Sequence, residues 1–256
     1  AQPTATPTEA PADGYPPGVD ESGVTDALTL AESYTDALAD TTFTVNHSVT
    51  VTFTNGTTYA RTTRRGTVTS RTEYHLNVTQ SGQRTPTGFA RSVEYYTADS
   101  SQETADESSD ATSDTVYRRA LSWNGNASVN EIDVDPKQQY SRLGIVDYET
   151  VYSLLSAAET TTVTDRSPAD GTPRVEIVVT GVTPSPSLGV SNVTEGTATL
   201  VVREDGTLER FTVRSEATLH GESVTVVRTL RYGDFGTAET NRPAWLSGNE
   251  TASVRS

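Results

Sequence analysis

The chain has 256 residues, and 33% of them are hydrophobic, which is enough to bury one sizeable core. Acidic residues outnumber basic residues by 34 to 19, and the net charge of −15 excludes a nucleic-acid surface, which needs clustered positive charge. Cysteine is absent, so disulfide bonds, a thiolate nucleophile and a cysteine-ligated metal are excluded, and no apolar run is long enough to span a membrane.

The charge pattern favours a protein from a halophile. Acidic tails on an ordinary protein, and a folded surface that stays hydrated in high salt, are alternative explanations of the acidity. The acids are spread along the chain, the sequence holds 45 threonines, and Lys137 is its single lysine. These features favour the second explanation.

The first 21 residues are predicted to be a disordered linker. They are rich in Pro, Thr and Ala and have no apolar period that could offset the entropy of ordering. Over 22–40, apolar residues from Val24 to Leu38 recur every three or four positions. This spacing predicts an amphipathic helix of about four to five turns with Ser22 as its N-cap.

A period of two follows and predicts a meander of antiparallel strands. Over 42–54, apolar residues alternate with polar ones, which indicates a long strand with one wet face. Asn55-Gly56 is a strong hairpin signal. It leads into a second predicted strand over 59–68, and a third follows over 73–78.

Further strands surround a helical insertion. Segments 88–96 and 115–123 are a predicted strand pair, and the acidic stretch 97–114 between them is interpreted as a mobile loop. Helical spacing over 135–144 and 146–159 predicts the insertion. Four later strands are predicted over 174–180, 197–203, 208–216 and 222–232.

Adjacent strands without βα alternation predict an α+β fold with antiparallel pairing. We expect one domain over 22–246 and a flexible C-terminal tail over 247–256.

No catalytic motif stands out in the sequence. His47, His75 and His220 lie on different predicted strands without metal-ligand spacing, and we expect His47 in the core and His75 in solvent. Asp133 and Asp135 lack the glycine-centred loop of an EF-hand and are interpreted as solvated acids. We therefore predict that the protein is not an enzyme and needs no cofactor or metal.

Asparagine followed by Ser or Thr two positions later is more frequent than expected. Six of the nine asparagines carry this glycosylation motif, whereas the Ser and Thr content predicts roughly two or three by chance. A by-product of threonine richness is the alternative explanation. The predicted glycan sites are Asn46, Asn55, Asn77, Asn126, Asn192 and Asn249.

The order of elements resembles the LolA/LppX-like lipoprotein carriers. The resemblance rests on the N-terminal helix, the wide antiparallel sheet, the helical insertion and the ending over 229–246, where a last strand runs into YGDFG and then PAW. In addition, YPPGVDESGVTDALTLAESYTDAL resembles the start of surface lipoproteins of halophilic archaea.

This resemblance implies a large curved antiparallel sheet, an incomplete β-barrel, with the N-terminal helix and the helical insertion on its concave side. It also implies an exported protein held at the extracellular face of the membrane by a lipidated cysteine before Ala1, although the printed chain has no cysteine. A lipid or other apolar ligand is expected between sheet and helices. The expected lining residues are Phe43, Val45, Val49, Phe53, Tyr74, Leu76, Phe89, Tyr95 and Trp123.

Two other functions stay open at this point. A fully packed core would make the protein a structural or interaction glycoprotein of the cell envelope, with other envelope proteins as partners. A cleft that brings His47 or His220 next to a carboxylate would favour an enzyme.

Overall fold

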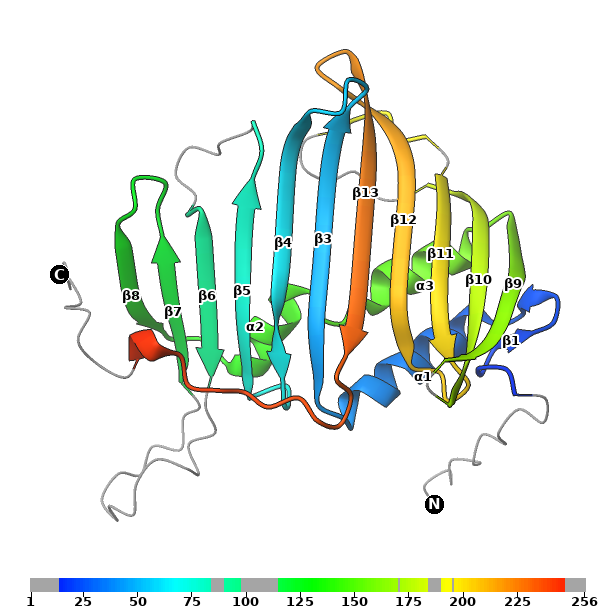
Figure 1. Cartoon of the computed structure of the whole chain (residues 1–256), viewed down its shortest axis with the longest axis horizontal. Helices are drawn as coiled ribbons and strands as arrows, with labels where there is room; N and C mark the ends of the chain where they lie inside the picture. The colour runs from blue at the N-terminus through cyan, green and yellow to red at the C-terminus, as the bar shows by residue number, and fades with distance from the viewer. Residues whose placement is uncertain are drawn as a thin grey trace, which may run out of the picture.

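The computed structural model describes residues 14–83, 90–97, 115–169, 171–183, 190–194 and 196–246. Its main feature is one antiparallel sheet of 11 strands in the order β8-β7-β6-β5-β4-β3-β13-β12-β11-β10-β9 (Figure 1). The strands are β3 (Phe43–Phe53), β4 (Thr58–Val68), β5 (Tyr74–Ser81), β6 (Ser92–Thr97), β7 (Val116–Leu121), β8 (Ala127–Ile132), β9 (Thr160–Ala169), β10 (Thr172–Val182), β11 (Gly196–Arg203), β12 (Leu208–Leu219) and β13 (Glu222–Gly233). Within the described residues the edge strands β8 and β9 each pair with one neighbour, so the sheet is open.

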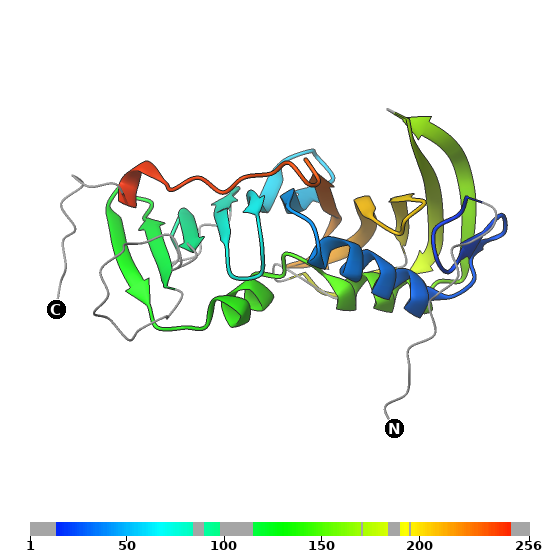
Figure 2. The same cartoon turned by 90° about the horizontal axis from the view of Figure 1, so that it is seen from below.

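The α-helices of the described chain lie on one face of this sheet (Figure 2). Helix α1 (Ala27–Ala39) precedes the first long strand, whereas α2 (Pro136–Leu143) and α3 (Tyr148–Ser156) form the mid-chain insertion, and α1 contacts α3. The predicted α+β class, with an N-terminal helix, a large antiparallel sheet and a helical insertion, is confirmed. No described helix is long and apolar enough to cross a membrane.

The N-terminal linker ends earlier than predicted. Strand β1 (Val19–Asp20) pairs with β2 (Gly23–Val24), and the Val19 side chain is only 6% exposed. The hairpin is attached to β9, because the backbone N–H of Val24 donates to Thr161 Oγ1 at 2.8 Å. Residues 14–21, expected to be disordered, therefore belong to the folded domain, while 1–13 and the predicted tail 247–256 lie outside the described residues.

Helix α1 is shorter than predicted and begins after Asp26. The Asp26 carboxylate accepts the backbone N–H groups of Leu28 and Thr29, both at 3.0 Å, and is the N-cap. Ser22, predicted as the cap, lies in the turn of the hairpin. The prediction was too long because Val24 fits the helical spacing although it belongs to β2.

The core is a set of rows that cross the sheet on its helix-covered face. Phe43, Val68 and Tyr74 are register partners on β3, β4 and β5, and they are 0–2% exposed. A second, smaller cluster lies at the other end of β3, where Val51 is buried and Phe53 is half-buried. The strands therefore bury one face in two separate places rather than uniformly.

Tyrosine hydroxyls attach the helical insertion to the sheet. Tyr74 Oη donates to the Pro136 carbonyl at the start of α2 at 3.2 Å, and Tyr232 Oη donates to the Ile145 carbonyl at 2.7 Å. The Tyr232 ring also packs edge-on against Phe43, with centroids 5.4 Å apart. These contacts fix both ends of α2 over the core, because a buried phenol needs a partner for its hydroxyl.

The segment after β13 runs along the strand ends towards β8 (Figure 1). Gly236 N donates to the Thr42 carbonyl at 2.8 Å, and Thr240 Oγ1 donates to the Glu73 carboxylate at 2.5 Å. A short 3-10 helix, Ala244–Leu246, ends the described chain. These bonds attach the segment to β3 and to the turn before β5.

Both edge strands were missed by the sequence prediction. Strand β8 is exposed along most of its length and β9 is rich in threonine, so neither shows apolar alternation. An edge strand needs little burial because its single neighbour supplies its backbone hydrogen bonds. Hydrophobic patterning therefore carries no signal for these strands.

Phe43→Ala should lower the free energy of unfolding by about 3–5 kcal/mol, because it opens a cavity in the main cluster. Phe53→Ala is the matched control on the same strand and should cost less than half as much, since Phe53 is half-buried. Urea denaturation at fixed salt measures both. Equal losses would contradict the division into a main and a minor cluster.

Candidate functional site

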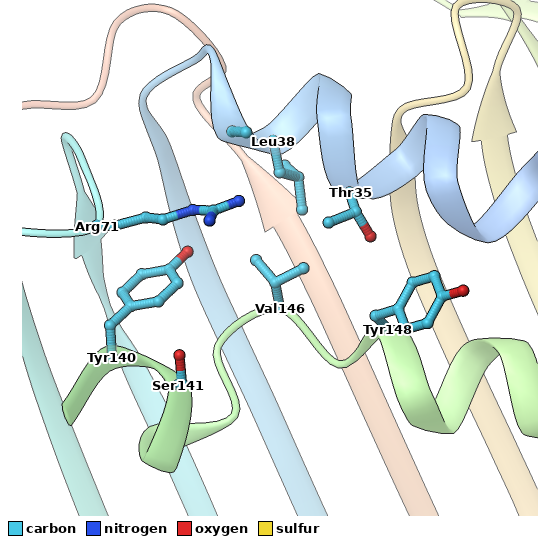
Figure 3. A pocket seen from close by; sticks show the side chains of 8 residues that line it. Thr35, Leu38, Arg71, Tyr140, Ser141, Val146 and Tyr148 are labelled. Carbon is cyan, nitrogen blue, oxygen red and sulfur yellow. The ribbon is translucent and has the colours of Figure 1, made fainter. Parts of the chain in front are cut away.

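A groove separates α1 from α2 and the start of α3 (Figure 3). Its volume is about 220 Å³. It is lined by Thr35, Leu38, Ala39, Arg71, Tyr140, Ser141, Val146 and Tyr148. The lining combines aliphatic groups, two aromatic rings and a few polar groups, which is the composition of a small-molecule site.

One end of the groove is polar. The Tyr140 hydroxyl points towards the Arg71 side chain, which reaches over from the turn between β4 and β5 (Figure 3). Burial raises the pKa of the Tyr140 phenol above its usual range, although the Arg71 charge acts in the opposite direction. Tyr140 therefore stays protonated near neutral pH and can donate a hydrogen bond beside a guanidinium.

A second polar group, the arginine cluster, lies on the helix-covered face of the central strands. It consists of His47 on β3, Arg64 on β4, Arg228 on β13, and Asp147 and Thr150 at the start of α3. Arg228 Nη1 contacts Asp147 Oδ2 at 3.4 Å and donates to Thr150 Oγ1 at 3.1 Å. This pair attaches α3 to the sheet.

The hydrogen bond of His47 fixes its tautomer. The ring is 5% exposed, and its Nδ1 lies 3.1 Å from Arg64 Nη1, which can only donate. Nδ1 must therefore accept, so the proton is on Nε2. Nε2 is buried and has no hydrogen-bond partner among the described residues.

The surroundings of His47 disfavour its charged form. Burial, followed by the charges of Arg64 and Arg228, lowers the pKa of His47 to about 4, although Asp147 acts in the opposite direction. The ring is therefore neutral at pH 7. Its hydrogen-bond partner is an arginine rather than a carboxylate, which is not the arrangement of a general base held by an acid.

The other histidines and the acidic pair are separate from both sites. His75, expected in solvent, is half-buried and packs edge-on against Tyr96 with ring centroids 6.0 Å apart. His220 lies in the turn between β12 and β13, near Tyr59. Asp135 caps α2 by accepting the Gln138 N–H at 3.0 Å. No group of three metal-ligating side chains occurs in the described part of the chain.

The predicted ligand-lining residues that the structure describes fall into different parts of the sheet. Phe43, Val45, Tyr74 and Leu76 are 0–4% exposed and pack in the main cluster, where the helices cover them. Val49 and Phe53 pack against the second cluster, and Tyr95 is half-buried beside the first. None of these residues lines the groove.

Trp123, a further member of that set, lies elsewhere. Trp123 is 39% exposed in the turn between β7 and β8, so its assignment to an interior face is wrong. The apolar pattern of β7 ends at Leu121, and the prediction extended the strand by two residues. Phe89 lies outside the described residues.

The groove itself was not predicted from the sequence. Arg71 comes from a strand turn and Ala39 from the end of α1, and no sequence spacing connects these positions with α2. The apolar stripe of α3 predicted that this helix packs against the rest of the fold, but it did not predict a groove. Only the positions of the helices on the sheet bring the lining residues together.

The glycosylation motifs differ in exposure. Asn55 and Asn126 lie in exposed turns and Asn192 is exposed, whereas Asn46 and Asn77 are half-buried on strands. The Asn77 amide nitrogen donates to Ser92 Oγ at 3.2 Å and to Glu94 Oε1 at 3.3 Å. Asn249 lies outside the described residues.

No protein-family model matches the sequence, and no curated protein matches it. Similar solved structures include LprF from Mycobacterium bovis, with 14% identity over 87% of this chain and 98% of that chain and a TM-score of 0.41. Lipoprotein LppX from Mycobacterium tuberculosis has 13% identity over 84% of this chain and 97% of that chain, with a TM-score of 0.35. A DUF1329 family protein from Desulfovibrio piger has 8% identity over 90% of this chain and 99% of that chain, with a TM-score of 0.26. Such values do not place the chain in a family, and the fold class rests on the strand order and helix positions described above.

His47 makes stability depend on pH. Its folded pKa of about 4 lies below the ordinary value of 6.5, so between these values the unfolded state binds a proton that the folded state does not. The free energy of unfolding should therefore fall, by up to about 3 kcal/mol, as the pH drops from 6.5 to 4. Urea denaturation over this range measures the slope.

His47→Gln should remove this part of the slope, because the Gln carbonyl can still accept from Arg64 but does not titrate in this range. His220→Gln, in an exposed turn, is the matched control and should leave the His47 contribution in place. Identical pH profiles for wild type and His47→Gln would show that the depressed pKa is wrong.

Proposed function

We propose that this protein is a non-catalytic, exported binding protein that holds part of a lipid or other apolar molecule in the groove between α1 and α2–α3. The observation that carries this proposal is the groove itself, in which Leu38, Val146 and the Tyr140 and Tyr148 rings offer apolar contact beside a polar end. The architecture, an open antiparallel sheet with helices on one face, is the one expected for a LolA/LppX-like carrier.

The volume of the groove limits how the ligand binds. About 220 Å³ is less than the 300–1,000 Å³ that encloses a drug-sized molecule. The groove therefore takes one segment of an apolar molecule and leaves the remainder outside. Arg71 and the Tyr140 hydroxyl, at the polar end, suit a polar group attached to that segment.

The location proposed from the sequence is the extracellular face of the membrane of a halophile, with an N-terminal lipid anchor. The net charge of −15 and the threonine-rich strands support a surface that stays hydrated in high salt. Strand β3 shows this pattern locally, because Thr44, Ser48 and Thr52 alternate with the residues of the core-facing side. An anchored protein of this kind would bind its ligand next to the lipid surface.

A structural or interaction glycoprotein of the cell envelope is the second candidate. It is favoured by the dense packing of Phe43 and Tyr74, both 0% exposed, at positions expected to line a cavity. This candidate needs no ligand in the groove. The two functions are therefore distinguished by what the groove binds.

Nile red, an uncharged probe that fluoresces in apolar sites, should bind the wild-type protein with a 1:1 stoichiometry. Ala39→Trp should weaken that binding at least tenfold, because the indole occupies the groove. Fluorescence titration measures both. Mass spectrometry of organic extracts of natively purified protein should identify an apolar molecule in the wild type.

Leu28→Trp is the matched control, since Leu28 is 44% exposed on α1 and does not line the groove. It should bind Nile red as the wild type does. Absence of both probe binding and an extracted molecule would reject the ligand-binding function and leave the envelope glycoprotein.

Glycan occupancy should follow the exposure of the amide nitrogen that carries the sugar. Asn55 and Asn126 should be modified in the native protein, because they lie in exposed turns. Asn77 should be mostly unmodified, because its amide nitrogen bonds Ser92 and Glu94 inside the sheet. Glycopeptide mass spectrometry gives the occupancies, and a higher value at Asn77 than at Asn55 would contradict this order.

A further inference from the structure

The arginine cluster has more hydrogen-bond donors than acceptors. His47 Nε2 carries a proton with no partner among the described residues, and the ring is 5% exposed. A buried donor without an acceptor costs free energy, so native proteins satisfy almost all such groups. The missing partner of His47 Nε2 must be an acceptor.

The same cluster has an excess of positive charge. Arg64 and Arg228 lie on the two strands that flank β3, and the charge of Arg228 lowers the pKa of Arg64. Among the described residues, Asp147 is the one carboxylate found to act on Arg64, and it raises that pKa. Arg228 forms the salt bridge with Asp147 at 3.4 Å. In the described part of the chain no carboxylate contacts Arg64, and Arg64 Nη1 donates a hydrogen bond to the neutral His47 ring.

A structural role alone does not explain Arg64. A half-buried guanidinium that no carboxylate contacts is unfavourable, and an apolar side chain of similar size would pack there at lower cost. The C-terminal end of α2 carries partial negative charge from the helix dipole. This end lies close to Arg64, since a Cβ on the C-cap residue Gly144 would be 3.8 Å from Arg64 Nη1. That partial charge does not neutralise a full positive charge.

We propose that Arg64, His47 and Arg228 form a binding site for one oxyanionic group, a carboxylate or a phosphate. Such a group supplies an acceptor for His47 Nε2, and its negative charge offsets the net positive charge of the cluster. Guanidinium groups match the planar or tetrahedral oxygens of carboxylate and phosphate with paired N–H donors, which a spherical halide cannot use in the same way. The site is separate from the groove, whose lining contains none of these residues, and it does not depend on the groove's function.

NMR of the histidine rings in the full 256-residue chain tests this site. Inorganic phosphate or acetate, added at constant ionic strength with chloride, should shift the His47 resonances in a saturable way. His220, in its exposed turn, serves as an internal reference and should not respond. Bound oxyanion should also raise the His47 pKa from about 4, because a neighbouring negative charge favours the imidazolium.

The source of the oxyanion is decided by comparing inorganic phosphate with dodecyl phosphate. Similar affinities would identify a free ion as the ligand. At least tenfold tighter binding of dodecyl phosphate would identify the headgroup of an amphipathic molecule. Both results support an oxyanion site at His47.

Arg64→Met should weaken phosphate binding at least tenfold. Arg65→Met is the matched control, because Arg65 is exposed on the opposite face of the same strand and should bind phosphate within twofold of the wild type. Without added oxyanion, Arg64→Met should have a melting temperature equal to or above that of the wild type, since it removes a half-buried charge that no described carboxylate contacts. Arg64→Lys keeps the charge without the paired donors and should lose part of the affinity.

Three results would overturn the proposal: no saturable response of His47 to phosphate or acetate, an equal response to chloride, or unchanged phosphate binding by folded Arg64→Met. A large loss of melting temperature in Arg64→Met without oxyanion would instead assign Arg64 a purely structural role. Arg64→Lys then completes the test. If Arg64 has only a structural role, folded Arg64→Lys should bind phosphate as tightly as the wild type.

Discussion

The main constraint on this structure is that the apolar side chains on one face of its sheet must be buried under helices or loops. One face of the eleven-stranded sheet carries two separate apolar clusters, and helices of 13, 8 and 9 residues cover only part of that face. The helices lie over the main cluster, and Val190 and Val193 pack in the second cluster. The remaining central region carries polar groups instead of apolar ones. The groove and the arginine cluster both follow from this incomplete cover.

Polar contacts fix the helical insertion where apolar packing alone would allow it to slide. Tyr74 and Tyr232 bond the backbone at the two ends of α2, and Arg228 bonds the start of α3. Each bond is directional, so the insertion has one position on the sheet. That position sets the width of the groove beside α1 and places Asp147 next to two arginines. The shape of the groove therefore depends on contacts made by residues far from its lining in sequence.

The sequence predicted elements wherever burial is periodic. Strand β3 and its partners were found because one face is buried and the other wet, and α2 and α3 because their apolar residues recur at helical spacing. The errors fall where burial and sequence period do not agree. Strands β8 and β9 bury little, and Trp123 continues an apolar run beyond the end of its strand. Ser22 has the residue type of an N-cap but does not precede the helix. In the candidate sites, His47 was correctly placed inside. Its arginine partner is 17 residues away, and only register shows it.

By itself, the sequence determined the α+β class, the antiparallel pairing and the excess of acidic residues. These properties depend on composition and on local period, which a linear chain displays directly. Tertiary structure alone decided which apolar residues are filled core and which border a groove, because the same pattern of alternation is compatible with both. It also decided that two arginines from different strands lie near one aspartate and a buried histidine, and that the aspartate forms its salt bridge with Arg228. This arrangement arises from strand register and helix placement, and neither can be predicted from a single segment of the sequence.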